Sequence, residues 1–498
     1  MMEFTIDDLQ KMMKLGEITA KELTEVFLER IEQIDKNGPK LNAIIEINPD
    51  VLDIAENLDK ERKKKGPRSS LHGIPVLLKD NIDTADKMMT TAGSLALDGH
   101  IALQDAFIVQ KLRDAGAIIL GKTNLSEWAN FRSTRSSSGW SSRGGQTKNP
   151  YILDRSPCGS SSGSAVAVAA DFCTVAIGTE TDGSVICPAH VNGIVGIKPT
   201  MGLVSRTGII PIAHSQDIAG PIARTVRDAA LLLNVMAGVD PEDPVTSNSK
   251  DRIPSDYTVY LDPNGLRGAR IGVARNYFGF NDLVDKVMEK AIEIMKDLGA
   301  VIIDPVTVEN VKELREPEYT VLLYELKHDM NKYLTERGLD IAHKSLKDLI
   351  DYNEKHKEQI MPYFGQEHFI RAEEKGPLTD GEYQTALEQC KKIAAEEGID
   401  TTIHEHHLDA IIAPSGGPAW PIDPANGDHF GGGSSSAAAV AGYPNITVPA
   451  GYIFDLPVGI SFFTSAFQEP KLLKYAYAYE QATKVHNPPK FLKSFYID

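Results

Sequence analysis

Hydrophobic positions near the N-terminus repeat with the spacing of an α-helix. Leu23, Phe27 and Ile31 lie four residues apart, so they share one face of a helix that we predict over residues 20–34, with Thr19 as its N-cap. The charged run at 60–65 precedes Gly66 and Pro67 and is typical of a solvated helix end. We therefore expect residues 1–70 to form a group of N-terminal helices.

From residue 73 the pattern changes to short apolar runs separated by loops rich in Gly and Ser. The runs occupy residues 74–78, 117–120, 175–178 and 194–197, and helical patterns occur between them at 106–115 and 226–237. Continuous apolar runs of this length are typical of strands buried on both faces. The alternation predicts an α/β fold in which helices cover both faces of a β-sheet.

The second half of the chain has a long charged stretch between two regions of strand-like texture. We predict an amphipathic helix at 283–298, a strand at 300–303, and helices outside the sheet over 309–405. Apolar runs return at 410–413, 446–448 and 459–463. If these rejoin the first sheet, residues 1–498 form one domain, with a core at 71–240, a mostly helical excursion at 241–405 and a return at 406–498.

Composition narrows the class of protein. The 498 residues are 42% hydrophobic and carry a formal net charge of −17, which repels phosphate backbones, so we expect no nucleic-acid partner. No apolar run reaches the ~18 residues of a membrane span, and the acidic N-terminus is unlike a signal peptide. Four cysteines without CxxC spacing make no disulfide framework. We therefore expect a cytoplasmic protein with reduced thiols.

Residues 159–164 form a Gly/Ser loop that runs into the small-residue stretch 165–170. Such a loop either presents free N–H groups at a helix start or simply packs tightly under the helix. It also matches G-x-S-x-G, but that motif follows a buried strand, whereas 154–158 is polar and contains Pro157. A phosphate-binding loop would end in Gly-Lys-Ser/Thr, which is missing here.

Two further segments follow predicted strands. Residues 179–184 come directly after the apolar run 175–178, and Gly183 permits a turn that aims consecutive N–H groups at one point, as an oxyanion hole requires. The alternative is an ordinary turn in which Asp182 or Ser184 caps a helix. Lys79 closes the run 74–78; it is either a solvated strand end or a base whose pKa is lowered by burial or a nearby cation.

The histidines do not indicate a metal site. The cluster at 404–407 (HEHH) is too compressed for the usual zinc spacing and suggests an exposed helix end. His190 lies near the 179–184 loop, but nothing in the sequence pairs it with a serine. We expect no metal and no cofactor.

Taken together, these segments resemble the amidase signature family. The matching motifs cover roughly residues 70–235 and 408–465: 73–80 (GIPVLLKD), 91–94 (TAGS), 121–124 (GKTN), 159–164 (GSSSGS), 178–184 (GTETDGS), 193–200 (GIVGIKPT), 217–221 (DIAGP) and 442–451 (GYPNITVPAG). The resemblance implies a large mixed, twisted β-sheet with helices on both faces.

The family's catalytic residues map onto three positions of this chain. The resemblance implies that Ser184 is the nucleophile, that Ser160, 24 residues earlier and after a cis peptide bond, bridges to it, and that Lys79 is the base. The N–H groups of Thr181, Asp182, Gly183 and Ser184 would hold the oxyanion. Ammonia would leave, and water would then cleave the acyl-enzyme.

Departures from the common family pattern favour one branch. Cys158 and Asp182 replace glycines, and Ile186 stands where many members have an arginine. These residues, with 124–130 (NLSEWAN) and 138–141 (SGWS), resemble the peptide-amidase branch, which removes ammonia from C-terminal peptide amides. This would make the substrate a small-molecule or peptide amide, and the chain a monomer or homodimer.

Three other functions remain open. The first is the glutaminase-type component of a tRNA-dependent amidotransferase, which requires partner subunits. The second is a general aliphatic or aryl amidase, and the third is a non-enzymatic protein on the same scaffold. Tyr319, Tyr324 and Tyr363 in the helical stretch either line a substrate pocket or are ordinary packing residues.

Overall fold

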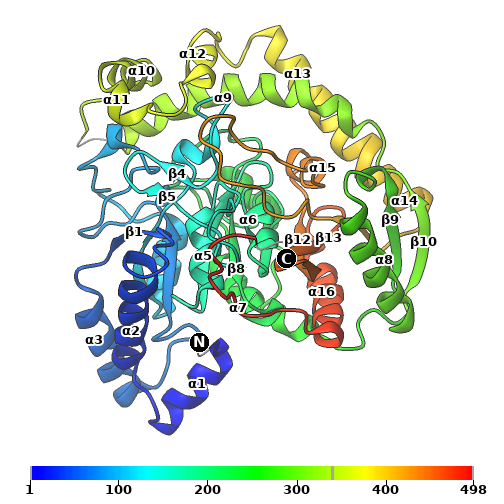
Figure 1. Ribbon diagram of the computed structural model, residues 1–498, viewed down its shortest axis with the longest axis horizontal. Coiled ribbons are helices and arrows are strands. Elements are labelled where there is room, and N and C mark those ends of the chain that lie inside the picture. Colours follow the sequence, from blue (N-terminus) through cyan, green and yellow to red (C-terminus); the bar gives the residue numbers. More distant parts are fainter. Residues whose placement is uncertain (1–2, 338–340, 496–498) are drawn as a thin grey trace.

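One mixed β-sheet of 11 strands forms the centre of the computed structural model, which describes residues 3–337 and 341–495 (Figure 1). The strand order is β1-β3-β2-β6-β8-β7-β12-β13-β11-β9-β10, and β4 and β5 form a separate pair. The bounds are β1 Ile44–Ile47, β2 Pro75–Lys79, β3 Ile118–Thr123, β4 Trp140–Ser141, β5 Gly145–Gln146, β6 Val175–Glu180, β7 Val195–Lys198, β8 Ile218–Ala223, β9 Arg270–Ala274, β10 Val301–Val306, β11 Ala410–Pro414, β12 Asn445–Ile453 and β13 Leu456–Phe463.

Helices surround this sheet, and the predicted α/β class with a large mixed sheet is confirmed. The α-helices are α1 Ile6–Leu15, α2 Ala20–Arg30, α3 Val51–Lys65, α4 Phe107–Asp114, α5 Ser162–Ala169, α6 Ile186–Val191, α7 Val226–Met236, α8 Asp282–Asp297, α9 Arg315–Glu336, α10 Leu346–Lys355, α11 Lys357–Ile360, α12 Glu367–Glu373, α13 Gly381–Lys391, α14 Thr401–Glu405, α15 Ser436–Val440 and α16 Glu469–Thr483.

The helices form two layers on the sheet and a separate arch above it. Helix α5 packs against β2, β6 and β8 and touches α6, whereas α7 packs against β8 and contacts α4 and α16. Helices α9 to α13 run across the top of the view in Figure 1, from the side of β1 towards β9 and β10. Apolar residues of the helices that cover the sheet share one core with it, whereas those of α9, α10, α12 and α13 form separate clusters.

Several strands occur where the sequence did not indicate them. The predicted strands at 74–78, 117–120, 175–178 and 410–413 are present as β2, β3, β6 and β11. The strand predicted at 300–303 is also present, as β10 beside β9. However, β1 lies within the N-terminal segment predicted as helices, and β9 was not predicted. The described residues of 309–405 contain no strand, as the sequence predicts. The helix predicted at 20–34 ends at Arg30, where a π-helical turn, Ile31–Lys36, continues it.

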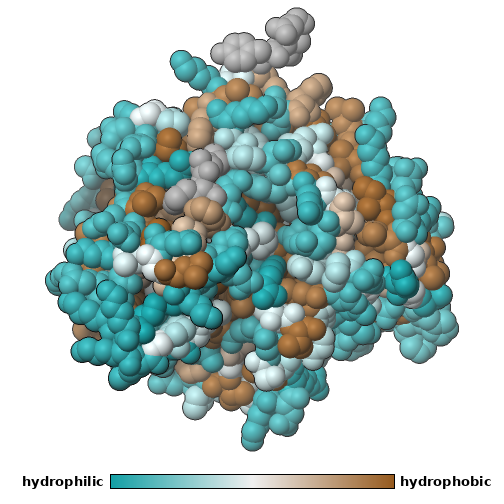
Figure 2. All heavy atoms as spheres, turned by 90° about the horizontal axis from the view of Figure 1, so that it is seen from below, coloured by the Kyte–Doolittle hydropathy of each residue, from teal (hydrophilic) through white to brown (hydrophobic). Residues whose placement is uncertain are grey.

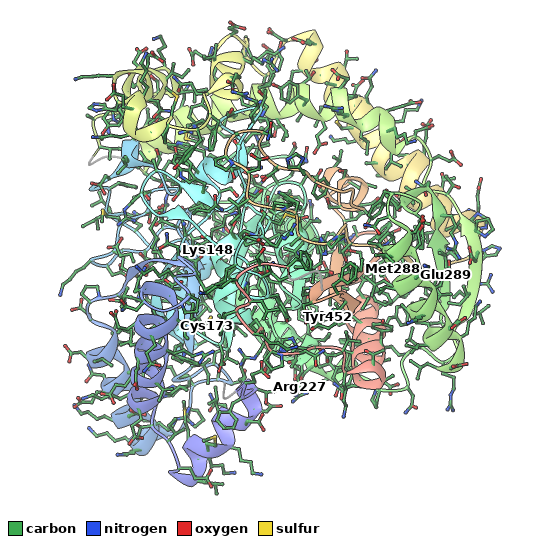
Figure 3. The ribbon with its side chains drawn as sticks, in the orientation of Figure 1. Lys148, Cys173, Arg227, Met288, Glu289 and Tyr452 are labelled. Atoms are coloured by element: carbon green, nitrogen blue, oxygen red, sulfur yellow. A yellow bond between two sulfur atoms is a disulfide. The ribbon has the colours of Figure 1, made fainter. Side chains whose placement is uncertain are left out.

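Helix α8 has the amphipathic pattern that the sequence predicts at 283–298. Met288 is 1% exposed and packs in the core, while Glu289, its neighbour in sequence, is exposed; Figure 3 shows the two side chains on different sides of the helix. Because consecutive residues of a helix are about 100° apart, one face meets the sheet and the other meets water.

The sheet topology brings four chain segments to one edge. Strands β2, β3 and β6 are parallel neighbours, so Lys79 and Glu180, at their carboxyl ends, lie at the same edge. Strand β8 runs antiparallel to β6, and Ile218 pairs with Glu180, which places Asp217 at that edge too. Loops that follow parallel strands at one edge are the usual position of a site in an α/β fold.

The surface is mainly hydrophilic, with smaller hydrophobic patches, on the face that Figure 2 shows. Within residues 3–337 and 341–495, none of the helices is long and apolar enough to cross a membrane.

Candidate active site

Lys79 is a buried amine at the end of β2. Its side chain is 0% exposed, and Nζ lies 2.7 Å from Ser160 Oγ, 2.9 Å from Thr179 Oγ1 and 3.1 Å from the Thr179 carbonyl oxygen. Burial lowers the pKa of Lys79 to about 7, although the charges of Asp217 and Glu180 act in the opposite direction. A substantial fraction of Lys79 is thus neutral near pH 7, and its lone pair can accept a proton. The alternative of a solvated strand end does not apply.

Ser160 lies in the loop before α5, and this loop meets the turn at residues 181–184. The peptide bond between Gly159 and Ser160 is cis, and the N–H of Ser161 donates to the Ser184 carbonyl at 3.1 Å. Ser161 Oγ also bonds to the carbonyl of Thr179 at 3.0 Å. The structure thus places Lys79 in contact with Ser160, and the main chain of Ser184 is hydrogen-bonded to the next residue, Ser161. A direct bond between the two serine hydroxyls is not formed in the described part of the chain.

The turn at 181–184 leaves consecutive N–H groups free. Among the residues that the structure describes, the N–H groups of Thr181, Asp182, Gly183 and Ser184 have no hydrogen-bond acceptor. Gly183 has φ 74°, and a Cβ at this position would lie 2.9 Å from Ser435 Oγ, so a larger residue would disturb the turn. Free donors in a turn beside a buried hydroxyl can stabilise an oxyanion.

Two carboxylates, Glu180 and Asp182, fix this turn. Glu180 accepts the N–H groups of Val185 and Ile186 at 2.7 and 2.9 Å, which anchors the start of α6. Asp182 accepts the hydroxyls of Ser435 and Ser436, both at 2.6 Å. The Asp182 side chain therefore holds α15 against the turn, whereas the predicted oxyanion role concerns its backbone N–H.

Ser184 opens into a two-lobed cleft. One lobe, of about 650 Å³, is lined by Ser184 together with residues of α9 such as Glu318 and Tyr319. The other lobe, of about 440 Å³, is lined by Trp420, Phe430 and the α15 serines. Both lobes share five lining residues, Asn130, Thr134, Gly159, Asp182 and His368, so they adjoin at the 181–184 turn. A cleft of this size accepts a group much larger than a simple carboxamide.

Aromatic side chains form part of the wall near Ser184. His368 stacks on Phe131 with ring centres 4.5 Å apart, and Tyr319 bonds to His368 at 3.0 Å. Burial, with the charge of Arg371 nearby, lowers the pKa of His368 to about 4, so this ring is neutral at pH 7. Of the three tyrosines considered from the sequence, Tyr319 lines the cleft, whereas Tyr324 is buried in packing and Tyr363 packs on Trp140.

The prediction that the cysteines form no disulfide was wrong for two of the four. Cys158 and Cys187 form a disulfide with Cα atoms 6.0 Å apart, and Cys173 and Cys390 are free and buried. The pair was hidden in the sequence because the two residues become neighbours only when the loops of Ser160 and Ser184 meet. The disulfide joins the residue before Gly159 to the third residue after Ser184.

Removing this disulfide should lower stability. Cys158 and Cys187 are 29 residues apart, and closing a loop of this length stabilises a protein by about 3.6 kcal/mol, mainly by restricting the unfolded chain. The double variant Cys158→Ser/Cys187→Ser should therefore unfold at a lower urea concentration than the oxidised wild type. Dithiothreitol should lower the wild-type midpoint equally and leave the double variant unchanged. An equal midpoint for the wild type and the double variant, each with and without dithiothreitol, would contradict the prediction.

The predicted exposed helix end is confirmed for the histidines at 404–407. Residues 404–407 end α14 and are largely exposed. His190 is fully buried in α6, and burial lowers its pKa to about 3. Neither ring nitrogen has a hydrogen-bond partner among the residues that the structure describes. The sequence did not indicate a third group, in which His214 meets the distant neighbours His328 and Asp329, with possible ligand atoms within 4.8 Å of one another. Both rings bond to Asp329, and the group lies outside the cleft.

Some residues of the site were missing from the sequence prediction. Thr179, which holds Lys79, lies in the 178–184 motif, but only the fold shows that its side chain meets the lysine. His368 and Glu318 belong to the helical stretch after Val306, and their approach to Ser184 depends on how α9 and α12 fold back over the sheet. No local pattern indicates such long-range contacts.

Comparison with known proteins places this geometry in a family. The family model described as Amidase matches residues 22–473. A probable amidase of Arabidopsis thaliana is 42% identical over 98% of this chain and 92% of its own length. The A component of the glutamyl-tRNA(Gln) amidotransferase of Thermoanaerobacter pseudethanolicus is 35% identical, with 98% of both chains covered.

Solved structures of peptide amidases are also similar to this chain. The peptide amidase of Stenotrophomonas maltophilia has a TM-score of 0.93 and 51% identity, with 98% of both chains covered. A peptide amidase in complex with the competitive inhibitor chymostatin has a TM-score of 0.95 and 51% identity, covering 97% of this chain and 98% of that one. The chain therefore belongs to the amidase signature family and is an amide-hydrolysing enzyme.

Proposed function

We propose that this enzyme converts C-terminal peptide amides to free acids and ammonia through an acyl-enzyme on Ser184. The observation that carries the mechanism is the buried Lys79 amine, 2.7 Å from Ser160 Oγ and with a pKa of about 7. Ser184 Oγ attacks the amide carbon while its proton passes to Ser160 and the Ser160 proton passes to neutral Lys79. The N–H groups of residues 181–184 stabilise the oxyanion.

The second half of the reaction reverses the proton transfers. Protonated Lys79 returns its proton through Ser160 to the amide nitrogen, the C–N bond breaks, and ammonia leaves. Water then attacks the ester with the same groups as base, and the free acid leaves Ser184.

The size of the cleft and the likeness to peptide amidases support a peptide substrate. Two adjoining lobes with aromatic walls suit the residues that precede a C-terminal amide. Similarity to the A component of amidotransferases keeps glutamine as a second candidate. Ile186, in place of an arginine, removes one anchor for a substrate carboxylate and argues against glutamine.

Ammonia release from a substrate panel separates these functions. The panel contains N-acetyl-dipeptide amides, glutamine, and aliphatic and aryl amides, each with purified chain alone. The proposal expects the highest kcat/KM on the peptide amides. Cleavage of glutamine above all others, or only when the other components of an amidotransferase are added, would overturn it.

The pH dependence should follow the protonation of Lys79. Only the neutral amine accepts a proton, so kcat/KM should fall about tenfold per pH unit below a pKa of about 7 and reach a plateau above it. An N-acetylated dipeptide amide has no group that titrates between pH 5 and 9. The fall of kcat/KM at low pH, the acidic limb of the profile, therefore reports a group of the enzyme. A limb near pH 10, where an exposed lysine titrates, would contradict this role of Lys79.

The cellular location stays a prediction. The sequence suggests the cytoplasm, but a disulfide between Cys158 and Cys187 is typical of an oxidising compartment.

A further inference from the structure

Asp217 is a buried carboxylate in the segment before β8, and it joins this segment to the turn at residues 181–184. It is 8% exposed. Its Oδ1 accepts the hydroxyl of Thr181 at 2.5 Å, and its Oδ2 accepts the N–H groups of Ile212 and Ala213 at 2.8 and 2.9 Å. Hydrogen bonds to a carboxylate are stronger than those between neutral groups. Thr181, whose N–H is one of the proposed oxyanion donors, is thus fixed by a carboxylate from another chain segment.

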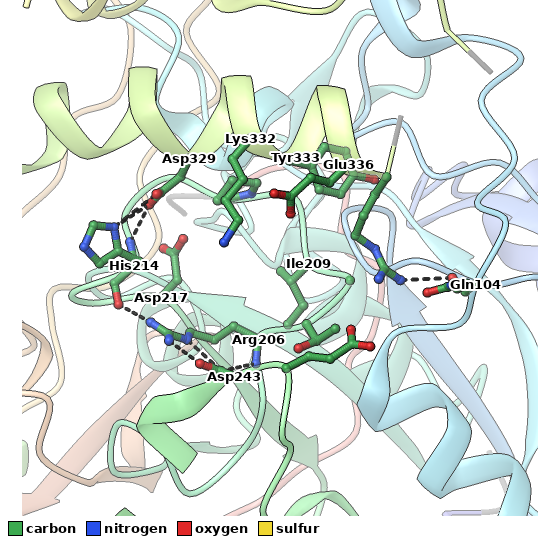
Figure 4. A pocket seen from close by; sticks show the side chains of 15 residues that line it. Gln104, Arg206, Ile209, His214, Asp217, Asp243, Asp329, Lys332, Tyr333 and Glu336 are labelled. Carbon is green, nitrogen blue, oxygen red and sulfur yellow. Dashed lines mark hydrogen bonds and ion pairs between the residues drawn. The ribbon is translucent and has the colours of Figure 1, made fainter. Parts of the chain in front are cut away.

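The other side of Asp217 faces a second cavity, of about 520 Å³, beneath α9. Figure 4 shows Asp217 on its wall with Arg206, His214, Asp329 and Lys332. These nearby charged groups have other partners or are exposed: Arg206 binds Asp243, and His214 binds Asp329. Within the described part of the chain, Asp217 has no cation in contact with it, so its negative charge is not neutralised by an ion pair. Burial raises the pKa of Asp217 to about 6, so the carboxylate is mostly ionised at pH 7 and above.

This charge acts on Lys79. Lys79 Nζ is bonded to Thr179, two residues before Thr181, and the carboxylates of Asp217 and Glu180 both favour its protonated form by raising its pKa. Proton transfer from Ser160 creates an ammonium ion on Lys79 in a site with 0% exposure. A buried ammonium is costly without a nearby negative charge, and Asp217 supplies one without binding the amine and blocking its lone pair.

We propose that Asp217 is a positioning residue with two effects: it holds Thr181 in the oxyanion turn, and its charge stabilises the ammonium that forms on Lys79 during attack. The inference rests on the proposed function, since it concerns the same proton relay. It assigns a role to a residue that touches neither the substrate nor Ser184.

Two substitutions separate the two effects. Thr181→Val removes the hydrogen bond, which also lowers the pKa of Asp217, so kcat is compared on the plateau near pH 9, where Asp217 stays charged. There kcat should fall about tenfold, and the pH limb should move less than in Asp217→Asn. Asp217→Asn removes the charge and replaces one acceptor oxygen by an NH₂ group, which cannot accept from Ile212 or Ala213. It should lower kcat about 100-fold and move the limb to lower pH, because the protonated form of Lys79 loses a favourable charge.

Matched controls identify a nonspecific effect. Glu242→Gln removes a carboxylate from the same cavity, at an exposed side chain, and should leave kcat and the pH limb as in the wild type. Thr181→Ser keeps the hydroxyl and should restore kcat relative to Thr181→Val. KM should stay within about twofold throughout, since neither effect acts on the bound ground state.

The outcome distinguishes this inference from the proposed function. If the wild type shows a limb near pH 7 and folded Asp217→Asn keeps both that limb and its kcat, the inference is wrong while the relay stands. If Asp217→Asn fails to fold, Thr181→Val with wild-type kcat overturns the positioning of the loop. A wild type without any limb near pH 7 overturns the role of Lys79 itself.

Discussion

Replacing Lys79 with methionine should lower kcat on a peptide amide by about 10⁴-fold, because members of a coupled catalytic group fail together. Methionine fills a similar volume but has no amine to take the proton from Ser160. Steady-state ammonia release at pH 8, where the wild-type lysine is mostly neutral, measures the effect. Circular dichroism and the thermal midpoint show whether the variant is folded.

Lys79→Arg is the matched control for charge. Arginine keeps a cation at this position but does not deprotonate in proteins, so this variant should be as inactive as Lys79→Met. If either folded variant kept more than about a tenth of wild-type kcat, Lys79 would not be the base.

Replacing Ser184 with alanine should lower kcat by about 10⁴-fold to 10⁶-fold and remove the acyl-enzyme. Ser160→Ala should be nearly as severe, because Lys79 then has no hydroxyl between it and Ser184. Ammonia release under single-turnover conditions measures both. Neither loss should be accompanied by a large change in the thermal midpoint.

Ser162→Ala is the matched control for these two serines. Ser162 belongs to the same Gly/Ser motif as the first residue of α5, is also buried, and donates to the Cys158 carbonyl at 2.6 Å. Its kcat should stay within a few-fold of the wild type. Wild-type activity in folded Ser184→Ala would show that another residue is the nucleophile.

The sequence predicted much of the fold because buried strands leave a local signal. Strands β2, β3, β6 and β11 are continuous apolar runs, and α8 has a clear helical period. Strand β8 has no such signal, since it contains Gly220 and Pro221, and proline is unusual in a central strand. A Cβ on Gly220 would lie 2.1 Å from the Ile197 carbonyl oxygen, so this glycine permits the close approach of β7.

The candidate site was predictable only in part, for a similar reason. The predicted residues Lys79, Ser160 and Ser184 lie in short motifs, and the structure brings their loops together at one sheet edge. Asp217, the disulfide and the cleft walls depend on contacts between distant segments. For example, Asp217 meets Thr181 because β8 is antiparallel to β6 and pairs Ile218 with Glu180. A linear pattern does not reveal which strands become neighbours.

The central claim is that Ser184 carries the acyl group, with a lysine in place of a histidine as base. The most direct test is rapid acid quenching during turnover of an N-acetyl-dipeptide amide, followed by mass spectrometry of the intact protein and of its peptides. The account predicts a mass increase equal to the acyl group, located on Ser184, with one ammonia released per adduct, and no adduct in Ser184→Ala. An adduct on another residue, or the same adduct in Ser184→Ala, would contradict it.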